Sequence, residues 1–364
     1  MSLKIKNADY YTTLENIRFN TESKCFEISS LDNKTTLTFE YKPNIPNNTW
    51  VPGVVHVFLL DSEYKNAEND VFSIKIDELE DGERLGWVFP IEVLESNDSD
   101  FANDDIFNCY RQAAYHSLLT MDFEVNHDTS KISDIYKNKI ICVLHRETVK
   151  KIPAFDITNY IISLYKYGYL YSSSNINYPE ISTSFKNLFI ENNNYTTIKL
   201  SKSKFNITSD EFTKSLFMKG LINQENILIR FIFLYQIIEH FITIYYDNSF
   251  QNCLNEYING TISKNDFREK INSCSEKNSI NHIITTSIID TTFKQMFLDK
   301  HKIFCQSIGQ ECKKDFAHCI YQFRNIIVHN IRNTVSKENE MKELVEIFEQ
   351  IIIDILMSYP NNQD

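Results

Sequence analysis

The amino-acid sequence predicts an α+β protein, with a β-rich N-terminal domain followed by an all-helical C-terminal domain. Apolar and polar residues alternate in short runs over residues 1 to about 100, as they do in half-buried strands. From residue 208 onward, apolar residues instead recur at helical spacing behind helix-start signals. The chain has 364 residues and is 42% hydrophobic, which is enough for two packed cores. We expect the β-rich domain over residues 1–200 and the helical domain over residues 201–364.

Short apolar runs give the expected strands of the N-terminal domain. Residues 25–28 and 37–41 alternate on either side of a turn at residues 31–34, which predicts a hairpin. Further strands are expected at residues 54–60, 72–76, 87–93 and 140–144, with a turn at residues 81–82. Helices are expected at residues 106–121, capped by Asp104 or Asp105, and at residues 156–169, followed by a polar loop at residues 172–178.

Capping signals and apolar periodicity define the helical domain. Thr208–Glu211 fits a capping box, and Ser263–Asp266 is a weaker version of the same signal. The expected helices cover residues 224–246, 283–297, 313–331 and 337–357.

The sequence predicts a cytoplasmic protein without a membrane span. The most apolar run, residues 227–246, is interrupted by charged and polar side chains such as Arg230 and Glu239. The N-terminus carries no apolar stretch of the length that secretion needs, so the eight cysteines are expected to be reduced thiols.

The charge balance limits which partners the chain can bind. A formal net charge of -12 is incompatible with binding a polyanion over the whole surface. Binding of a nucleic acid would need a local basic patch, for which Lys313, Lys314, Arg324 and Arg332 are the candidates. The chain lacks the glycine-rich phosphate-binding motifs and the G-x-S-x-G motif, so nucleotide hydrolysis and serine-esterase chemistry have no support.

One motif near the C-terminus carries recognisable chemistry. Arg324 and Asn325 are followed by three aliphatic residues and then by His329, within an expected helix. Asn325 and His329 share a helix face, and Arg324 lies at its edge. A guanidinium can clamp a phosphate, and an imidazole can accept or donate a proton near neutral pH. These groups suit transfer of an RNA 2′-hydroxyl onto the adjacent phosphorus, a reaction that needs neither a protein nucleophile nor a metal.

The motif resembles the R-N-x-x-x-H form of the HEPN superfamily motif, and residues 208–358 resemble the helical bundle of that family. The resemblance implies a metal-independent endoribonuclease without cofactors, in which two protomers form a composite site and leave 2′,3′-cyclic phosphate ends. Arg324 would stabilise the phosphate in the transition state, Asn325 would be the orienting residue, and His329 would be the acid or base. Glu239, in the first long helix, is expected to support Arg324 by pairing with it.

The resemblance also implies a biological setting. Such proteins commonly serve as toxins or antiphage abortive-infection effectors, with RNA as substrate. The N-terminal domain would then sense a trigger, restrain the nuclease, or bind a regulator or antitoxin.

Three other interpretations stay open at the level of sequence. The C-terminal domain could be a non-catalytic HEPN-type module that binds RNA or protein. It could be a helical interaction domain in which Arg324 and His329 are incidental. Thirdly, the N-terminal half could be the enzymatic part, with the helices as dimeriser.

The cysteines near the motif are a second feature of interest. Cys305, Cys312 and Cys319 recur every seven residues, and His318 is adjacent. No C-x-x-C pair accompanies them, so we expect buried structural thiols and no metal site.

Overall fold

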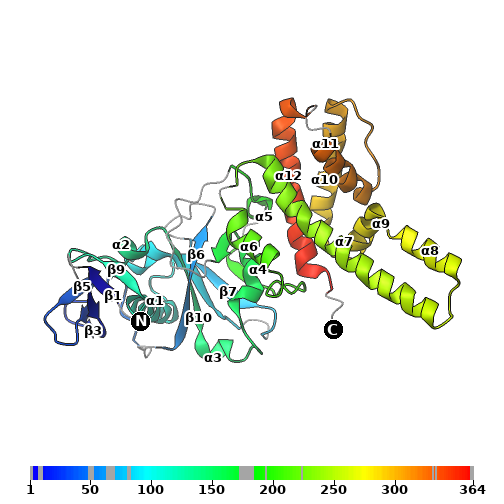
Figure 1. Ribbon diagram of the computed structural model, residues 1–364. Helices are drawn as coiled ribbons and strands as arrows, with labels where there is room; N and C mark the ends of the chain where they lie inside the picture. The colour runs from blue at the N-terminus through cyan, green and yellow to red at the C-terminus, as the bar shows by residue number, and fades with distance from the viewer. Residues whose placement is uncertain are drawn as a thin grey trace. The chain divides into compact units, whose positions relative to one another are not determined.

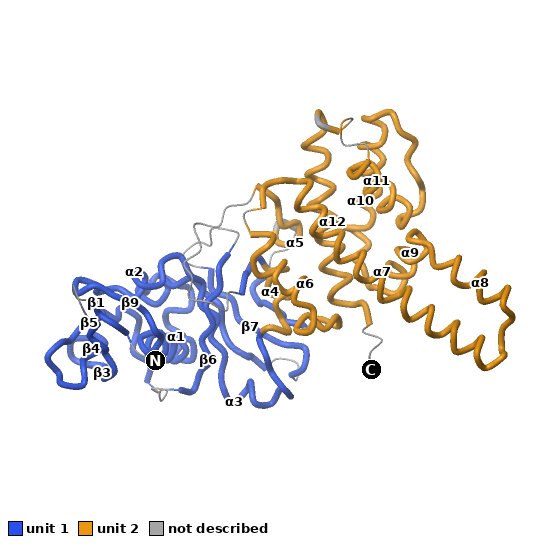
Figure 2. The backbone as a smooth tube through the Cα atoms, viewed as in Figure 1, with its two compact units in different colours: residues 1–157, 168–181, 195–201 blue, residues 158–167, 182–194, 202–364 orange. Residues whose placement is uncertain are grey.

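The computed structural model describes residues 3–6, 11–47, 53–62, 70–79, 83–171, 184–192, 195–222, 224–329, 332 and 334–360. They form the predicted α+β fold, with strands in the N-terminal region and helices in the C-terminal half (Figure 1). The chain divides into two compact units (Figure 2). We call residues 1–157, 168–181 and 195–201 the β-rich unit, and residues 158–167, 182–194 and 202–364 the helical unit.

The β-rich unit is built on a six-stranded sheet. Its order is β11 (Tyr169–Tyr171), β6 (Val55–Ser62), β10 (Ile140–His145), β8 (Gly86–Pro90), β7 (Phe72–Ile76) and β12 (Thr197–Leu200). All neighbours are antiparallel except β7 and β12. Two three-stranded sheets complete the unit. They are β2 (Tyr11–Leu14), β1 (Leu3–Lys6) and β9 (Phe123–Val125), and β3 (Asn16–Asn20), β4 (Cys25–Ser29) and β5 (Thr36–Glu40).

Most predicted elements of this unit are confirmed. Strands β4 and β5 form the expected hairpin, with Cys25 opposite Glu40. Helix α1 (Asp105–Leu119) begins at Asp104, whose carboxylate accepts a hydrogen bond from the Phe107 amide and so caps the helix. It contacts β6 and β8 and buries Phe107 against Trp87. Short helices α2 (Ile132–Tyr136) and α3 (Arg146–Val149) flank β10 in sequence.

Two predictions for this region were wrong in part. The strand expected at residues 87–93 ends at Pro90, and the chain continues as a 3₁₀ turn, η1 (Ile91–Leu94). The helix expected at residues 156–169 is a 3₁₀ turn, η2 (Ile157–Tyr160), followed by α4 (Ile161–Lys166). Gly168 adopts a φ of 80°, which turns the chain into β11. The turn expected at residues 81–82 and the loop expected at residues 172–178 lie outside the described residues.

The helical unit contains the long helices of the C-terminal half. Helix α7 (Ile227–Ile258) contacts α8 (Lys264–Ser273), α9 (Glu276–Thr286) and α12 (Glu338–Ser358), while α10 (Thr291–Ser307) contacts α12 and α11 (Phe316–His329). Shorter elements are α5 (Leu188–Asn192), α6 (Glu211–Ser215), a π-helical turn at Leu216–Gly220 and η5 (Val335–Lys337). Phe231, Phe297, Phe323 and Phe348 meet edge to face or tilted in its core.

The helix-capping residues predicted for the helical unit are confirmed in part. The capping box of Ser263 and Asp266 is confirmed at the start of α8. The cap of α6 is Asp210, not Thr208, because the Asp210 carboxylate accepts from the Phe212 amide. The single helix expected at residues 283–297 is two helices, since the chain leaves α9 after Thr286 and Asp290 caps α10.

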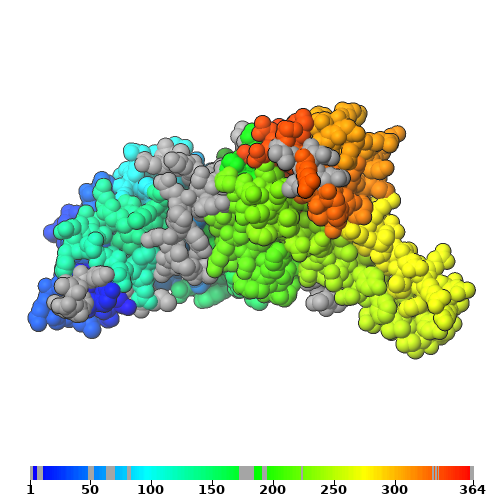
Figure 3. All heavy atoms as spheres, turned by 45° about the horizontal axis from the view of Figure 1, so that its top comes forward, coloured from blue at the N-terminus to red at the C-terminus, as the bar shows by residue number. Residues whose placement is uncertain are grey.

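Helix α7 combines a buried half with a projecting half. Figure 3 shows its C-terminal end and α8, in yellow-green and yellow, standing out from the rest of the helical unit. No residue of α8 is buried. Within the described residues, α7 is the one helix long and apolar enough to cross a membrane by length and composition, with a mean hydropathy of 1.7. Of the 18-residue window that passes this test, 44% is buried, and one such helix is weak evidence for a membrane span, because core helices of soluble proteins pass the same test.

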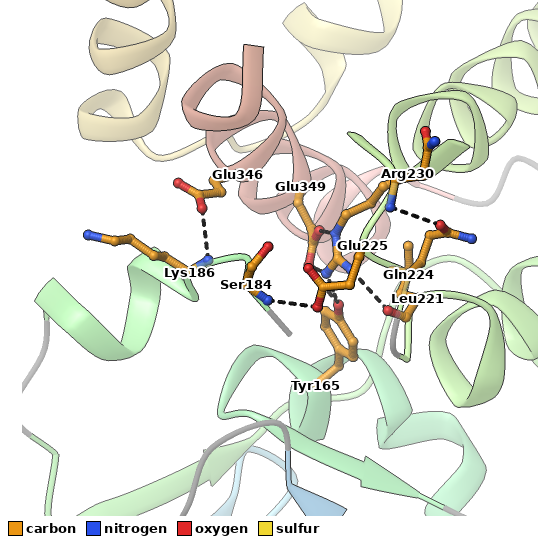
Figure 4. A network of polar contacts seen from close by, with 10 residues as sticks. Tyr165, Ser184, Lys186, Leu221, Gln224, Glu225, Arg230, Glu346 and Glu349 are labelled. Atoms are coloured by element: carbon orange, nitrogen blue, oxygen red, sulfur yellow. Dashed lines mark hydrogen bonds and ion pairs between the residues drawn. The ribbon is translucent and has the colours of Figure 1, made fainter. Parts of the chain in front are cut away.

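A buried ion pair fixes α7 against α12 (Figure 4). Arg230 donates from Nε to Glu349 Oε2 at 2.7 Å and from Nη2 to Glu349 Oε1 at 2.9 Å. Its Nη1 donates to the Leu221 carbonyl, and the Tyr165 hydroxyl of α4 donates to Glu349 Oε1 at 2.6 Å. The guanidinium also lies over the ring of Phe185. All of these contacts join residues of the helical unit. They therefore anchor α4 and the segment before α5 to α7 and α12.

Candidate functional site

Helix α11 carries the predicted motif at its C-terminal end. Its apolar residues Phe316, Ile320, Phe323 and Ile327 follow helical spacing and are buried in the bundle. This packing fixes the rotation of the helix and leaves Arg324 and Asn325 at the edge of the buried face, half-buried. The last residue of the helix is His329, and its side chain is exposed.

The structure brings the three motif side chains together. Nη1 of Arg324 donates to Oδ1 of Asn325 at 3.0 Å and lies 3.5 Å from Nε2 of His329. The longer contact requires an imidazole nitrogen that carries no proton, because a guanidinium can only donate. Arg324 therefore sits between an amide oxygen and the imidazole, and all three groups face one region at the end of α11.

Two carboxylates from other helices flank the guanidinium. Glu239 Oε1 of α7 lies 3.9 Å from Arg324 Nη2, as expected from the sequence, and Glu276 Oε1 of α9 lies 3.9 Å from Arg324 Nε. These distances are long for hydrogen bonds, and the side chains are 41%, 34% and 23% exposed for Glu239, Glu276 and Arg324. Pairs of this kind contribute little to stability but orient the charge.

Tyr235 completes the surroundings of Arg324. The guanidinium carbon lies 5.9 Å from the centre of its ring, and the Tyr235 hydroxyl donates to Glu276 Oε1 at 2.9 Å. Burial, reinforced by the Glu276 carboxylate, raises the pKa of Tyr235 well above its ordinary value. The phenol therefore stays protonated and keeps Glu276 pointing toward Arg324. Sequence reasoning missed both residues, because nothing in their spacing connects them to the motif.

An open pocket of about 340 Å³ lies on the Glu239 side of the site. It is lined by Asp210, Phe212, Gln236, Glu239, His240 and Thr243. His240 Nε2 lies 3.9 Å from Asp210 Oδ2, and Gln236 donates to Glu239 at 2.6 Å. Two carboxylates in the wall disfavour a phosphate in this pocket.

The cations expected around the motif lie on both sides of Arg324 in the chain. Lys313 and Lys314 precede α11, and the Lys313 amide donates to Gln322 Oε1 at 3.2 Å, which places this backbone against the side chain two residues before Arg324. Arg332 is exposed just beyond the helix. Within α11, Arg324 lies 3.5 Å from His329.

The cysteines lie at the other end of α11. Cys305 and Cys319 are buried as predicted, and Nδ1 of His318 contacts Asp315 Oδ1 at 2.8 Å. The histidine beside the thiols is His301, which sequence reasoning missed. Its i, i+4 spacing with Cys305 on one helix was the available signal.

Comparisons of the chain with protein-family models, with curated proteins and with solved structures gave no match.

Proposed function

We propose that this chain is a metal-independent endoribonuclease that acts as a homodimer in the cytoplasm, as a toxin or abortive-infection effector. The observation that carries the proposal is the convergence of Arg324, Asn325 and His329 at the exposed end of α11. A guanidinium that can bind a phosphate and an imidazole that can transfer a proton contact each other there. Cleavage of an RNA backbone requires both groups.

The proposed reaction uses the substrate's own nucleophile. The 2′-hydroxyl oxygen attacks the adjacent phosphorus while one His329 takes its proton. The bond from phosphorus to the 5′-oxygen breaks, and that oxygen takes a proton from a second imidazole. The products are a 2′,3′-cyclic phosphate and a 5′-hydroxyl, and Arg324 stabilises the negative charge on the phosphate oxygens in between.

One protomer offers a single motif histidine, so base and acid have to come from two copies. Val328 and His329 are exposed at the tip of α11, with Val328 at 48%, which leaves this tip free to meet a second copy across a two-fold axis. A composite site then holds two Arg324 and two His329 side chains.

A second candidate is a non-catalytic helical module that binds a protein partner or RNA. The acidic groups favour this alternative, because Glu239 and Glu276 flank Arg324 and the formal net charge is -12. In that case the motif is an interaction surface, and no bond is broken.

Cleavage assays with matched histidine variants separate the two candidates. The purified chain is incubated with RNA without added divalent metal, beside His329→Ala, Arg324→Ala and His318→Ala. His318 lies on the same helix but bonds to Asp315, so it controls for loss of any helix histidine. We expect wild type and His318→Ala to release cyclic phosphate ends, and the other two variants to be at least about a hundredfold slower.

Two further readouts guard against contaminating nuclease and against a missing trigger. A substrate with a 2′-deoxy sugar at the cleaved position should resist the enzyme. Expression in bacteria should slow growth for wild type and His318→Ala but not for His329→Ala. Equal activity and equal growth inhibition by His329→Ala would eliminate the ribonuclease and leave the binding module.

A further inference from the structure

Three thiols and one imidazole gather where α10 passes into α11. His301 and Cys305 lie one turn apart on the last part of α10, Cys312 lies in the connection, and Cys319 lies in the first turn of α11. The donor atoms of His301, Cys305 and Cys312 all lie within 4.8 Å of one another. The Cys319 sulfur is not within 4.8 Å of all three, but it lies close to Cys312, since both thiols donate to the carbonyl oxygen of Lys313, at 3.1 Å from Cys319 and 3.0 Å from Cys312.

The spacing of the donor atoms of His301, Cys305 and Cys312 is close to that of three ligands around one tetrahedral zinc ion. With zinc–sulfur bonds of about 2.3 Å and zinc–nitrogen bonds of about 2.0 Å, a nitrogen and a sulfur ligand sit about 3.6 Å apart. Nδ1 of His301 lies 3.4 Å from the Cys312 sulfur, and the Cys305 sulfur lies 3.9 Å from Nδ1 and 3.6 Å from Nε2.

The surroundings also suit a metal. The side chains of His301, Cys305 and Cys319 are fully buried, and the imidazole stacks on Phe297.

We propose that His301, Cys305, Cys312 and Cys319 bind one structural zinc ion in a closed Cys₃His site. Three sulfurs and one imidazole nitrogen are a ligand set of the structural zinc class, and four protein ligands leave no position for substrate. The departure from the sequence-based expectation comes from His301, which supplies the ligand that His318 does not.

The zinc ion would cross-link the loop between α10 and α11 to both helices. Its ligands span residues 301–319, so the ion would tie the end of α10, the intervening loop and the start of α11 into one unit. Helix α11 also carries Arg324 and His329, at its opposite end. The zinc site therefore supports the position of the motif helix, and it exists whether or not the motif cleaves RNA.

Metal analysis of the full-length protein tests the proposal. The chain is purified without a metal-affinity step, and its zinc content is measured by mass spectrometry beside Cys312→Ser, Cys319→Ser and Cys253→Ser. Cys253 is a buried cysteine of α7, so it controls for loss of any buried thiol in the helical unit. We expect about one zinc per chain for wild type and Cys253→Ser, and at least about tenfold less for Cys312→Ser and Cys319→Ser.

Wild-type measurements keep the test decisive if the serine variants fail to fold. Titration with a thiol reagent should release the zinc in step with modification of three cysteines. Cobalt substituted for zinc should give the intense near-ultraviolet band of thiolate-to-cobalt charge transfer. Wild-type protein that contains no zinc and takes up none when it is added would overturn the site, as would a disulfide among Cys305, Cys312 and Cys319 in the native chain. Full zinc content in Cys319→Ser would remove Cys319 from the ligand set.

Discussion

At the scale of single residues, two arginines of the helical unit show how burial changes what an ion pair does. Arg324 has carboxylates at 3.9 Å and is partly exposed, so water screens its pairs and they orient the side chain without adding much stability. Arg230 is 1% exposed and Glu349 is 8% exposed, with contacts below 3 Å. Removing one partner there leaves a charge buried without compensation.

Replacement of Arg230 should therefore be among the most damaging changes in the helical unit. We expect Arg230→Met to lower the free energy of unfolding by about 3–5 kcal/mol, because, among the described residues, Glu349 then keeps a hydrogen bond from the Tyr165 hydroxyl alone. The double variant Arg230→Met with Glu349→Gln should recover much of that loss, since a neutral amide can still accept from Tyr165. Chemical denaturation monitored by circular dichroism measures both. A double variant as unstable as the single one would show that the buried charge is not the cause.

The sequence could predict part of the candidate site at this scale. Arg324, Asn325 and His329 share one helix, so the helical repeat alone places them together. Glu276 and Tyr235 lie on other helices, and only the packing of α7, α9 and α11 brings them to Arg324. The pairing of His301 with Cys305 could be predicted, because the two residues lie four apart on one helix. The regular spacing of the cysteines instead suggested His318, their neighbour in the sequence.

At the scale of elements, the sequence predicted best where local chemistry decides the structure. The hairpin of β4 and β5 and the cap of α1 depend on turn residues and on Asp104, which act over a few positions. The predictions failed where a single residue interrupts a continuous apolar pattern. Gly168 ends the expected helix by turning into β11, and Asp290 starts a new helix within the stretch that was expected to be one helix. Periodicity averages over such positions and cannot detect them.

Strand β8 supplies a sharp test of sheet packing. Gly86 lies opposite Leu144 of β10, and a Cβ atom at this position would overlap the backbone carbonyl of Val143. We expect Gly86→Ala to lower the free energy of unfolding by about 3 kcal/mol or more, because a backbone atom of a central strand cannot move aside. Differential scanning calorimetry measures the loss.

A second glycine provides the control for this substitution. Gly260 has a φ of 70° with open space around its Cβ position, so Gly260→Ala should cost only about 1 kcal/mol from backbone strain. Equal effects of the two substitutions would mean that contact with Val143 is not what requires glycine in β8.

At the scale of the whole molecule, the two units interleave along the chain. Residues 158–167 and 184–192 belong with the helices, whereas β11 and β12, close to them in sequence, pair with β6 and β7. Patterning along the sequence locates such short segments but does not say which core they join. That choice is made by contacts distant in sequence, such as the bond from Tyr165 to Glu349.

This interleaving predicts which segments lose protection from hydrogen exchange together. Local stability follows the core to which a segment is anchored, not its place in the sequence. We expect Arg230→Met to speed amide hydrogen exchange in α7, α12 and the segment 158–167, and Gly86→Ala to speed it in β6, β10 and β11. Hydrogen-exchange mass spectrometry of the full-length variants separates peptides from 158–167 and from 169–171, which are neighbours in the chain. If α4 responded to Gly86→Ala and not to Arg230→Met, the Tyr165 and Glu349 contact would not anchor it, and the assignment of this segment to the helical unit would be wrong.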